Sequence, residues 1–359
     1  MDAADLDYPL PDAAIAQEPA EPRDSARLLV DRGPGRPVDH RRVLDLPELL
    51  QPGDLLVVND TKVIPARLHL RKDTGGAVEV LLLERRPEGA WEALVRPSRR
   101  VPPGTRLTVD GAHGTPDAVA VEVGDVLDDD GRRLVVLHHG EADDLDVLAR
   151  SGEVPLPPYI RVQLADPDRY QTVYARTPGS VAAPTAGLHL TKAVLERCRR
   201  RGVEVATVEL VVGLGTFRPI TAQRVEDHPM HAERYRIPPE AAAAIHARRD
   251  RWASGAGREG GAVVAVGTTV VRALEAWAAT GRAEGTTDLF IREPYPFAVV
   301  DRLLTNFHVP RSSLLALVQA LVGPRWRDLY AEALAQGYRF LSFGDAMLLT
   351  RRAGSVDRP

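Results

Sequence analysis

The sequence has little cysteine, no long apolar run and no strong excess of charge. Its one cysteine, Cys198, excludes an internal disulfide and a cysteine-rich zinc or iron–sulfur site within one chain. The apolar runs are much shorter than the roughly 20 residues that a membrane-spanning helix needs. The N-terminus, MDAADLDYPLPDAAIAQEP, is acidic and lacks the basic start and apolar core of a signal peptide. We therefore expect a cytoplasmic protein.

Charge of neither sign dominates the chain. Its 359 residues include 46 basic and 50 acidic side chains, which gives a net charge of −4. A dedicated nucleic-acid-binding domain typically has a pI above about 9, so this balance does not indicate one. It does not exclude one either, because local basic clusters matter more than totals. One such cluster is Arg96, Arg99 and Arg100, for which a solvated loop is the alternative interpretation.

The period of the apolar pattern changes along the chain and predicts two domains. From about residue 54 to 140, short strand-like segments follow one another, separated by turns rich in Gly, Pro and Asp, which is typical of a small antiparallel barrel or sandwich. After about residue 150, strand-like and helix-like segments alternate, which favours an α/β core. We predict an α/β body formed by residues 1–62 and 152–359, with an inserted antiparallel β-barrel domain at residues 63–151.

The segment from Tyr170 to Leu190, YQTVYARTPGSVAAPTAGLHL, is hard to explain as scaffold. Its small residues, Gly187 among them, would let the backbone approach a ligand closely. We predict that Thr185 lies where a helix begins, at a potential anion site. His189 is a candidate general base or acid, because an unperturbed histidine titrates near neutral pH. A packed loop, with His189 bonded to backbone, is the alternative.

Two further segments carry polar or glycine residues after apolar strands. In ELVVGLGTFRPI, the predicted strand runs into the loop residues Gly213, Gly215, Thr216 and Phe217, which match the glycine loop of nucleotide-binding folds only weakly. A plain tight turn is the alternative. The segment EDHPMHAERYRI brings together His228, His231 and Glu233. Its spacing lacks the helical H-E-x-x-H pattern, so we favour hydrogen-bonding or acid–base roles over a metal site.

Three more segments place hydrogen-bonding groups where α/β proteins often bind ligands. The segment AVGTTVVRALE predicts a strand followed by a helix that Thr268 or Thr269 caps, with ordinary capping or an anion site as the two interpretations. The segment VDRLLTNFH ends a strand, and NDTK joins the body to the barrel, where a structural turn is the alternative. The candidate residues of these segments are Asp60, Thr268, Thr269, Arg272, Asn306 and His308.

Taken together, these segments resemble the S-adenosylmethionine:tRNA ribosyltransferase-isomerase family of queuosine biosynthesis. The matching blocks are NDTKVIPARL, ALVRPSRRVPPGT, GEVPLPPYI, YQTVYA, GSVAAPTAGLHLT, VGLGTFRPI, HPMHAERYRI, AVGTTVVRALE, VDRLLTNFHVP and FLSFGDAMLL. Each block alone is a weak signal, but all ten occur in the family's order and span nearly the whole chain. One departure is LFIREPYPF, which lacks the glycine of the family's usual proline–glycine–tyrosine turn.

The resemblance implies a reaction. The ribosyl group of S-adenosylmethionine is transferred to 7-aminomethyl-7-deazaguanine at the tRNA wobble position and isomerised, giving epoxyqueuosine and releasing adenine and methionine. S-adenosylmethionine is consumed as a co-substrate, and neither a metal nor another cofactor is expected. The partners implied are S-adenosylmethionine and the anticodon region of tRNA, with no membrane, and we expect a monomer or a weak homo-oligomer.

The resemblance and the chemistry together assign candidate roles. The candidates for acid–base catalysis are His189, His228, His231 and Asp60, with His308 also considered. The methionine carboxylate suits Thr185, or Thr268 and Thr269 with Arg272, and the sulfonium suits Glu233 or Phe217. The predicted S-adenosylmethionine-binding set is Thr185, Gly187, Gly213, Gly215, Thr216, Phe217, Glu233, Thr268, Thr269, Arg272, Asn306 and His308. The predicted RNA contacts are Arg96, Arg99 and Arg100.

Three alternatives to this function stay open at this point. An enzyme of the same fold could transfer the ribosyl group to a small-molecule acceptor. A non-catalytic RNA-binding protein could be built on the barrel, although it would not need the dense polar motifs of the body. A methyltransferase could use VGLGTF as its nucleotide loop, but Pro219, where such a fold needs a helix, counts against it.

Overall fold

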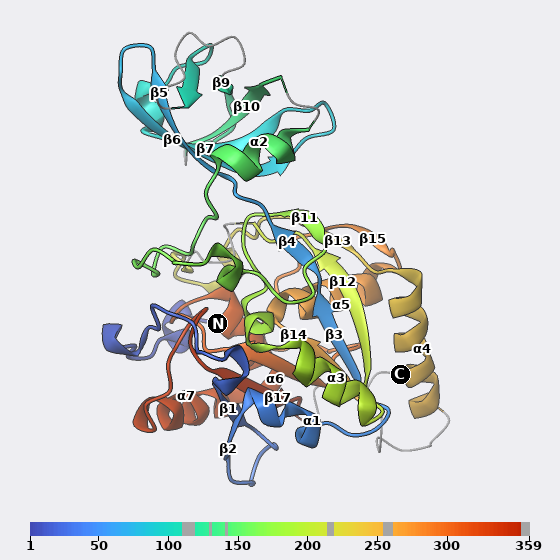
Figure 1. Ribbon diagram of the computed structural model, residues 1–359. Helices are drawn as coiled ribbons and strands as arrows, with labels where there is room; N and C mark the ends of the chain where they lie inside the picture. The colour runs from blue at the N-terminus through green and yellow to red at the C-terminus, as the bar shows by residue number, and fades with distance from the viewer. Residues whose placement is uncertain (110–118, 129–130, 141–142, 214–218, 254–260, 353–359) are drawn as a thin grey trace. The chain divides into compact units, whose positions relative to one another are not determined.

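The computed structural model describes residues 1–109, 119–128, 131–140, 143–213, 219–253 and 261–352. By its internal contacts the chain divides into two units (Figure 1). The first comprises Met1–Thr61, Pro158–Thr177 and Ala183–Pro359, and the second comprises Lys62–Pro157 and Pro178–Ala182. The predicted α/β body with an inserted β-barrel is therefore confirmed. The interval of residues 63–151 for the inserted domain stays a prediction.

A nine-stranded sheet forms the centre of the first unit. Its strand order is β15-β13-β12-β3-β14-β16-β17-β1-β2. The four middle strands, β12, β3, β14 and β16, are parallel to one another, and β17 is antiparallel to β16. The bounds are β1 Arg27–Val30, β2 Asp39–Arg42, β3 Leu55–Asn59, β12 Glu204–Leu210, β13 Glu233–Arg236, β14 Val263–Val266, β15 Glu284–Thr287, β16 Arg302–Asn306 and β17 Ala346–Thr350.

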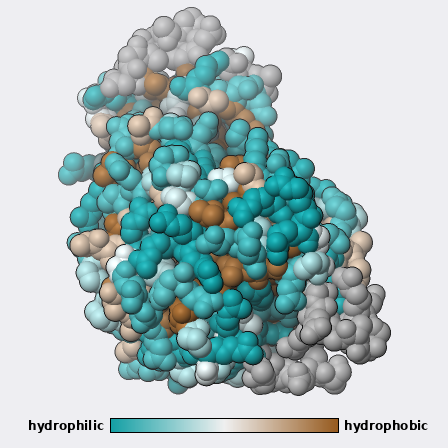
Figure 2. Space-filling view, turned by 60° about the horizontal axis from the view of Figure 1, so that its bottom comes forward, coloured by the Kyte–Doolittle hydropathy of each residue, from teal (hydrophilic) through white to brown (hydrophobic). Residues whose placement is uncertain are grey.

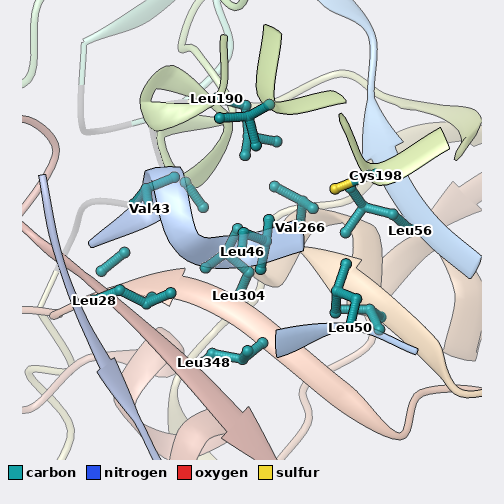
Figure 3. Packing of buried hydrophobic residues seen from close by; sticks show 14 of the residues in the cluster. Leu28, Val43, Leu46, Leu50, Leu56, Leu190, Cys198, Val266, Leu304 and Leu348 are labelled. Atoms are coloured by element: carbon teal, nitrogen blue, oxygen red, sulfur yellow. The ribbon is translucent and has the colours of Figure 1, made fainter. Parts of the chain in front are cut away.

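Helices cover both faces of this sheet because its central strands are apolar on both sides. In β14, Val264 and Val266 join a core cluster with α1 and α3 (Figure 3). Their neighbours Val263 and Ala265 are also buried, and side chains alternate between the two faces along a strand. α5 packs across β3, β12, β14 and β16. The helices are α1 Leu46–Leu49, α3 Lys192–Arg200, α4 Pro239–Ala253, α5 Thr268–Thr280, α6 Ser313–Val322 and α7 Trp326–Ala335.

Cys198 belongs to this core cluster rather than to the surface. It lies on the apolar face of α3 and is fully buried beside Leu56 (Figure 3). Burial raises the pKa of its thiol to about 11. The side chain therefore packs as a small apolar group.

The second unit is a closed barrel with the strand order β10-β7-β6-β5-β8-β9, in which every pairing is antiparallel. Its buried strand positions are apolar, as in Leu68, Val80 and Val121. The bounds are β5 Arg67–Lys72, β6 Ala77–Arg85, β7 Trp91–Arg96, β8 Arg106–Val109, β9 Ala120–Val126 and β10 Arg132–His138, followed by α2 Asp144–Ser151. β4 (Thr61–Val63) pairs separately with β11 (Thr177–Ser180).

Candidate functional site

The parallel strands of the body end at a pocket lined by both apolar and polar residues. β14 leads into Gly267, and β16 ends in Thr305 and Asn306. The carboxyl ends of parallel strands are where open α/β sheets bind ligands. The lining residues are Tyr159, Ala183–Ala186, Val212, Gly267–Thr269, Thr305–Val309, Leu314, Leu341 and Ser342. The pocket thus brings together five predicted binding residues: Thr185, Thr268, Thr269, Asn306 and His308.

Asn306 links two segments at this pocket. Its side-chain nitrogen lies 2.8 Å from His189 Nε2, and its oxygen accepts a hydrogen bond of 3.0 Å from the Thr185 hydroxyl. His189 is 4% exposed, and burial, reinforced by Arg339 and Arg23, lowers its pKa to about 4. The imidazole is therefore neutral near pH 7, with Nε2 accepting from the amide. Asn306 lines the pocket, and His189 stands behind it.

His308 is a second buried, neutral histidine. Its Nε2 lies 3.0 Å from the hydroxyl of Thr305, and burial lowers its pKa to about 3. Its backbone is fixed as well, because its N–H donates to the Tyr330 hydroxyl at 3.0 Å and its carbonyl accepts from Tyr8 at 2.5 Å. This histidine therefore presents a neutral ring in a fixed position.

The structure corrects the prediction that Thr185 begins a helix. Thr185–His189 form a single 3-10 turn, and Leu190 after it is extended. The helix that follows, α3, is capped by the hydroxyl of Thr191, which accepts from the N–H of Val194 at 3.2 Å. Because the Thr185 hydroxyl already donates to Asn306, Thr185 orients a pocket residue and does not cap a helix.

A second pocket adjoins the first through the shared residue Leu314. It is lined by His228–His231, Glu233, Arg272, Leu289–Ile291, Ser313, Leu314 and Leu317. Glu233 and Arg272 form a buried ion pair. Glu233 also accepts from the N–H of Gly213 at 3.2 Å, and Arg272 donates to the carbonyls of Leu289 and Thr287. The charge of Arg272 is thus already compensated within the protein.

His228 is a titratable residue in the wall of this second pocket. Burial first, and then the neighbouring His231, lower the pKa of His228. Its ring meets Phe290 edge to face at a centroid distance of 6.0 Å. Its buried Nδ1 has no hydrogen-bond partner among the residues that the structure describes. A ligand in this pocket would meet an aromatic wall and an available ring nitrogen.

Asp60 lines neither pocket. It is buried, and one carboxylate oxygen accepts from Arg176 Nε at 3.0 Å and from Nη2 at 2.7 Å. Its carbonyl accepts the N–H groups of Arg176 and Thr177. Asp60 therefore anchors the chain that leads into β11.

Among the predicted glycines, Gly187 serves packing. A Cβ at this position would lie 1.9 Å from the Tyr174 hydroxyl, so only glycine fits. Gly213 contributes the N–H bonded to Glu233. Gly215, Thr216 and Phe217 lie outside the described residues.

Sequence reasoning missed several lining residues of the first pocket. Tyr159 and Ser342 face each other there, with their hydroxyl oxygens 2.6 Å apart. They are brought together from positions 183 residues apart, and Leu341 beside them adopts a positive φ of 68°. No local pattern in the sequence predicts the contact between Tyr159 and Ser342 or the positive φ of Leu341.

The predicted RNA contacts lie on the barrel unit. Arg96 ends β7, and Arg99 and Arg100 follow in a short 3-10 turn; all three are exposed. Arg133 fixes this turn by donating to the carbonyl and hydroxyl oxygens of Ser98 at 2.9 and 3.2 Å. The turn therefore exposes the side chains of Arg99 and Arg100 on a backbone that Arg133 holds in place.

No described helix is long and apolar enough to cross a membrane. On the face in Figure 2, hydrophilic residues predominate and hydrophobic ones form separate small spots. No group of three or more His, Cys, Asp or Glu side chains that could hold a metal ion occurs within those described residues.

A sheet with parallel centre strands, pockets near their carboxyl ends and an inserted barrel defines an α/β protein with a candidate small-molecule site and a separate β-barrel unit. The chain belongs to the queuosine biosynthesis protein family, whose model matches residues 3–349.

Relatives support this membership over nearly the full length. The chain is 53% identical to the S-adenosylmethionine:tRNA ribosyltransferase-isomerase of Thermus thermophilus, over 96% of this chain and 98% of the relative. It is 50% identical to the enzyme of the same name from Moorella thermoacetica, over 97% and 100%. The crystal structure of an S-adenosylmethionine tRNA ribosyltransferase from Thermotoga maritima is similar with a TM-score of 0.53 and 37% identity, covering 96% of this chain and 99% of that one.

Proposed function

We propose that this protein is an S-adenosylmethionine:tRNA ribosyltransferase-isomerase. It transfers the ribosyl group of S-adenosylmethionine to 7-aminomethyl-7-deazaguanine at the wobble position of tRNA and isomerises it to the epoxycyclopentanediol of epoxyqueuosine. Adenine and methionine are released, and S-adenosylmethionine is consumed. The observation that carries this proposal is the identity of about half of all residues with enzymes of that name over nearly the whole chain.

The two adjoining pockets suit the two ends of S-adenosylmethionine. The first offers small residues, the threonines of the α5 N-terminus and Asn306, which suit a polar amino-acid end. The second offers Phe290, Leu289 and His228, which suit a flat heterocycle such as adenine. The buried carboxylate of Glu233 lies in the second pocket and favours a nearby sulfonium, even though Arg272 offsets part of its charge.

The predicted catalytic residues divide by position. His228 and His231 line the second pocket, so we assign proton transfer to them: one to the departing adenine and one from the carbon beside the sulfonium. His189 stands behind Asn306 and acts through it, by fixing the orientation of the amide. Asp60 acts through Arg176 on the chain that leads to β11.

The acceptor is tRNA, and the barrel supplies the contacts. Arg96, Arg99 and Arg100 are exposed and close together in sequence, as phosphate-binding arginines are. We place the anticodon arm on them. The protein acts in the cytoplasm, and its reaction needs no metal.

The decisive experiment is incubation with S-adenosylmethionine and tRNA carrying 7-aminomethyl-7-deazaguanine, followed by mass analysis of the digested nucleosides. We expect epoxyqueuosine, with adenine and methionine in equal amounts. A methyltransferase would instead form S-adenosylhomocysteine and a methylated nucleoside. Turnover of the free deazaguanine without any binding of tRNA would support the small-molecule acceptor and contradict our proposal.

A further inference from the structure

The N-terminus of α5 opens into the first pocket without a side-chain cap. Gly267 occupies the N-cap position, where glycine has no oxygen to offer. Its φ of 93° turns the chain sharply from β14 into α5. The first N–H groups of a helix have no acceptor within the helix and carry its positive dipole end. Gly267, Thr268 and Thr269 all line the pocket, so this end of the helix faces ligand space.

A second observation points to a ligand at the same place. Thr269 is only 7% exposed, and its buried hydroxyl oxygen has no hydrogen-bond partner among the described residues. A Cβ built on Gly267 would lie 3.5 Å from this oxygen and 3.7 Å from the Cβ of Ala186. The hydroxyl therefore lies beside the bare face of Gly267, between residues of the pocket wall. Leaving such a group unpaired costs about 1–3 kcal/mol.

Several other polar groups at these two pockets are already engaged. The Thr185 hydroxyl donates to Asn306. Arg272 forms an ion pair with Glu233 in the second pocket and donates to two carbonyls. The Thr305 hydroxyl lies against His308. By contrast, no described residue accepts from the Thr269 hydroxyl or from the first N–H groups of α5.

We propose that the first turn of α5 and the Thr269 hydroxyl bind the α-carboxylate of S-adenosylmethionine. This inference rests on the proposed function and specifies one end of its substrate. A carboxylate placed there accepts from the N–H groups at the helix start and from the hydroxyl, and it faces the positive end of the dipole. The methionine end then occupies the first pocket, and the nucleoside end extends past Leu314 towards His228.

The test compares S-adenosylmethionine with its decarboxylated analogue, which differs only in the missing carboxylate. Calorimetric titrations measure both affinities for the unaltered protein and for Thr269→Val and Thr269→Ser, with and without an unmodified tRNA transcript. We expect Thr269→Val to weaken S-adenosylmethionine binding roughly 10-fold, the effect of losing one charge-assisted hydrogen bond. Binding of the analogue should stay within about twofold, and Thr269→Ser should restore the preference.

Thr280→Val is the matched control, because it removes the same hydroxyl at the other end of α5, where it bonds to Ala276. It should leave the preference for the carboxylate unchanged. Retained binding of the analogue shows that each variant is folded. Two results overturn the proposal: Thr269→Val that keeps the full preference, or Thr269→Val that weakens both ligands equally.

The two hypotheses fail differently. If the unaltered protein binds neither ligand and forms no epoxyqueuosine, the proposed function is wrong. If it forms epoxyqueuosine while Thr269→Val keeps the full preference, only the carboxylate site is wrong.

Discussion

Acid should destabilise the α/β body through its two buried histidines. His189 and His308 have pKa values lowered to about 4 and about 3, with burial as the main cause in both. In the unfolded chain, a histidine titrates near pH 6.5. At pH values between the folded-state pKa values and about 6.5, both histidines are protonated in the unfolded chain and neutral in the folded chain. Stability is therefore complete above about pH 6.5 and is lost as the pH falls towards the folded-state pKa values.

The size of the loss follows from the width of that window. From pH 6.5 to pH 5 is about 1.5 units, and each unit corresponds to about 1.4 kcal/mol, so each histidine costs about 2 kcal/mol at pH 5. Both side chains are more than nine-tenths buried, so solvent screening does not reduce this figure much. The two together should remove about 4 kcal/mol, a large part of the stability of an ordinary domain.

The assay is urea unfolding at pH 7 and pH 5, followed by fluorescence of the buried Trp277 and Trp326 of the body. The comparison is His189→Gln, which keeps an acceptor for Asn306 but cannot titrate. Between pH 7 and pH 5, the variant should lose about 2 kcal/mol less free energy of unfolding than the unaltered protein. Carboxylates titrate in both proteins and cancel in the difference. Equal losses in the two proteins would refute the argument that His189 is held neutral by burial.

Three further results are expected. Replacing Arg99 and Arg100 with Glu should weaken tRNA binding and make the fall of log affinity with log salt concentration shallower by about 2. Unchanged filter binding over a salt series would show that this turn does not contact RNA. Gly187→Ala should cost about 1–3 kcal/mol in urea unfolding, because its Cβ overlaps the hydroxyl of Tyr174. Adding Tyr174→Phe should recover part of that cost, and no recovery would place the strain elsewhere. Arg272→Met should cost about 3–5 kcal/mol, because it removes the cation that pairs with the buried Glu233 carboxylate, and an unchanged thermal melt would contradict this.

Polar residues that the sequence places at strand ends come together at the first pocket. Asn306, Thr268 and Thr269 each follow an apolar strand, and the carboxyl ends of parallel strands meet at one edge whatever the details of the fold. The change of apolar period likewise predicts the barrel, because strand and helix patterns differ in period.

The rest depends on contacts between distant positions. The sequence predicts a helix start at Thr185, but Leu190 is extended in the structure and the helix starts after Thr191. The partner of Arg272 lies 39 residues away, so its engagement with Glu233 could not be read from the motif AVGTTVVRALE. A residue's chemistry can be nominated from sequence, but whether that chemistry is already in use is a tertiary property.

The burial of Cys198 has a practical consequence for following this protein's motions. The chain's single thiol is held inside the core with a raised pKa, so maleimide reagents should react slowly with it while the body stays folded. A cysteine introduced on the barrel surface could then be labelled alone, and a fluorophore there would report tRNA docking without background. The rate at which the native thiol is modified would in turn measure how often the surrounding core opens.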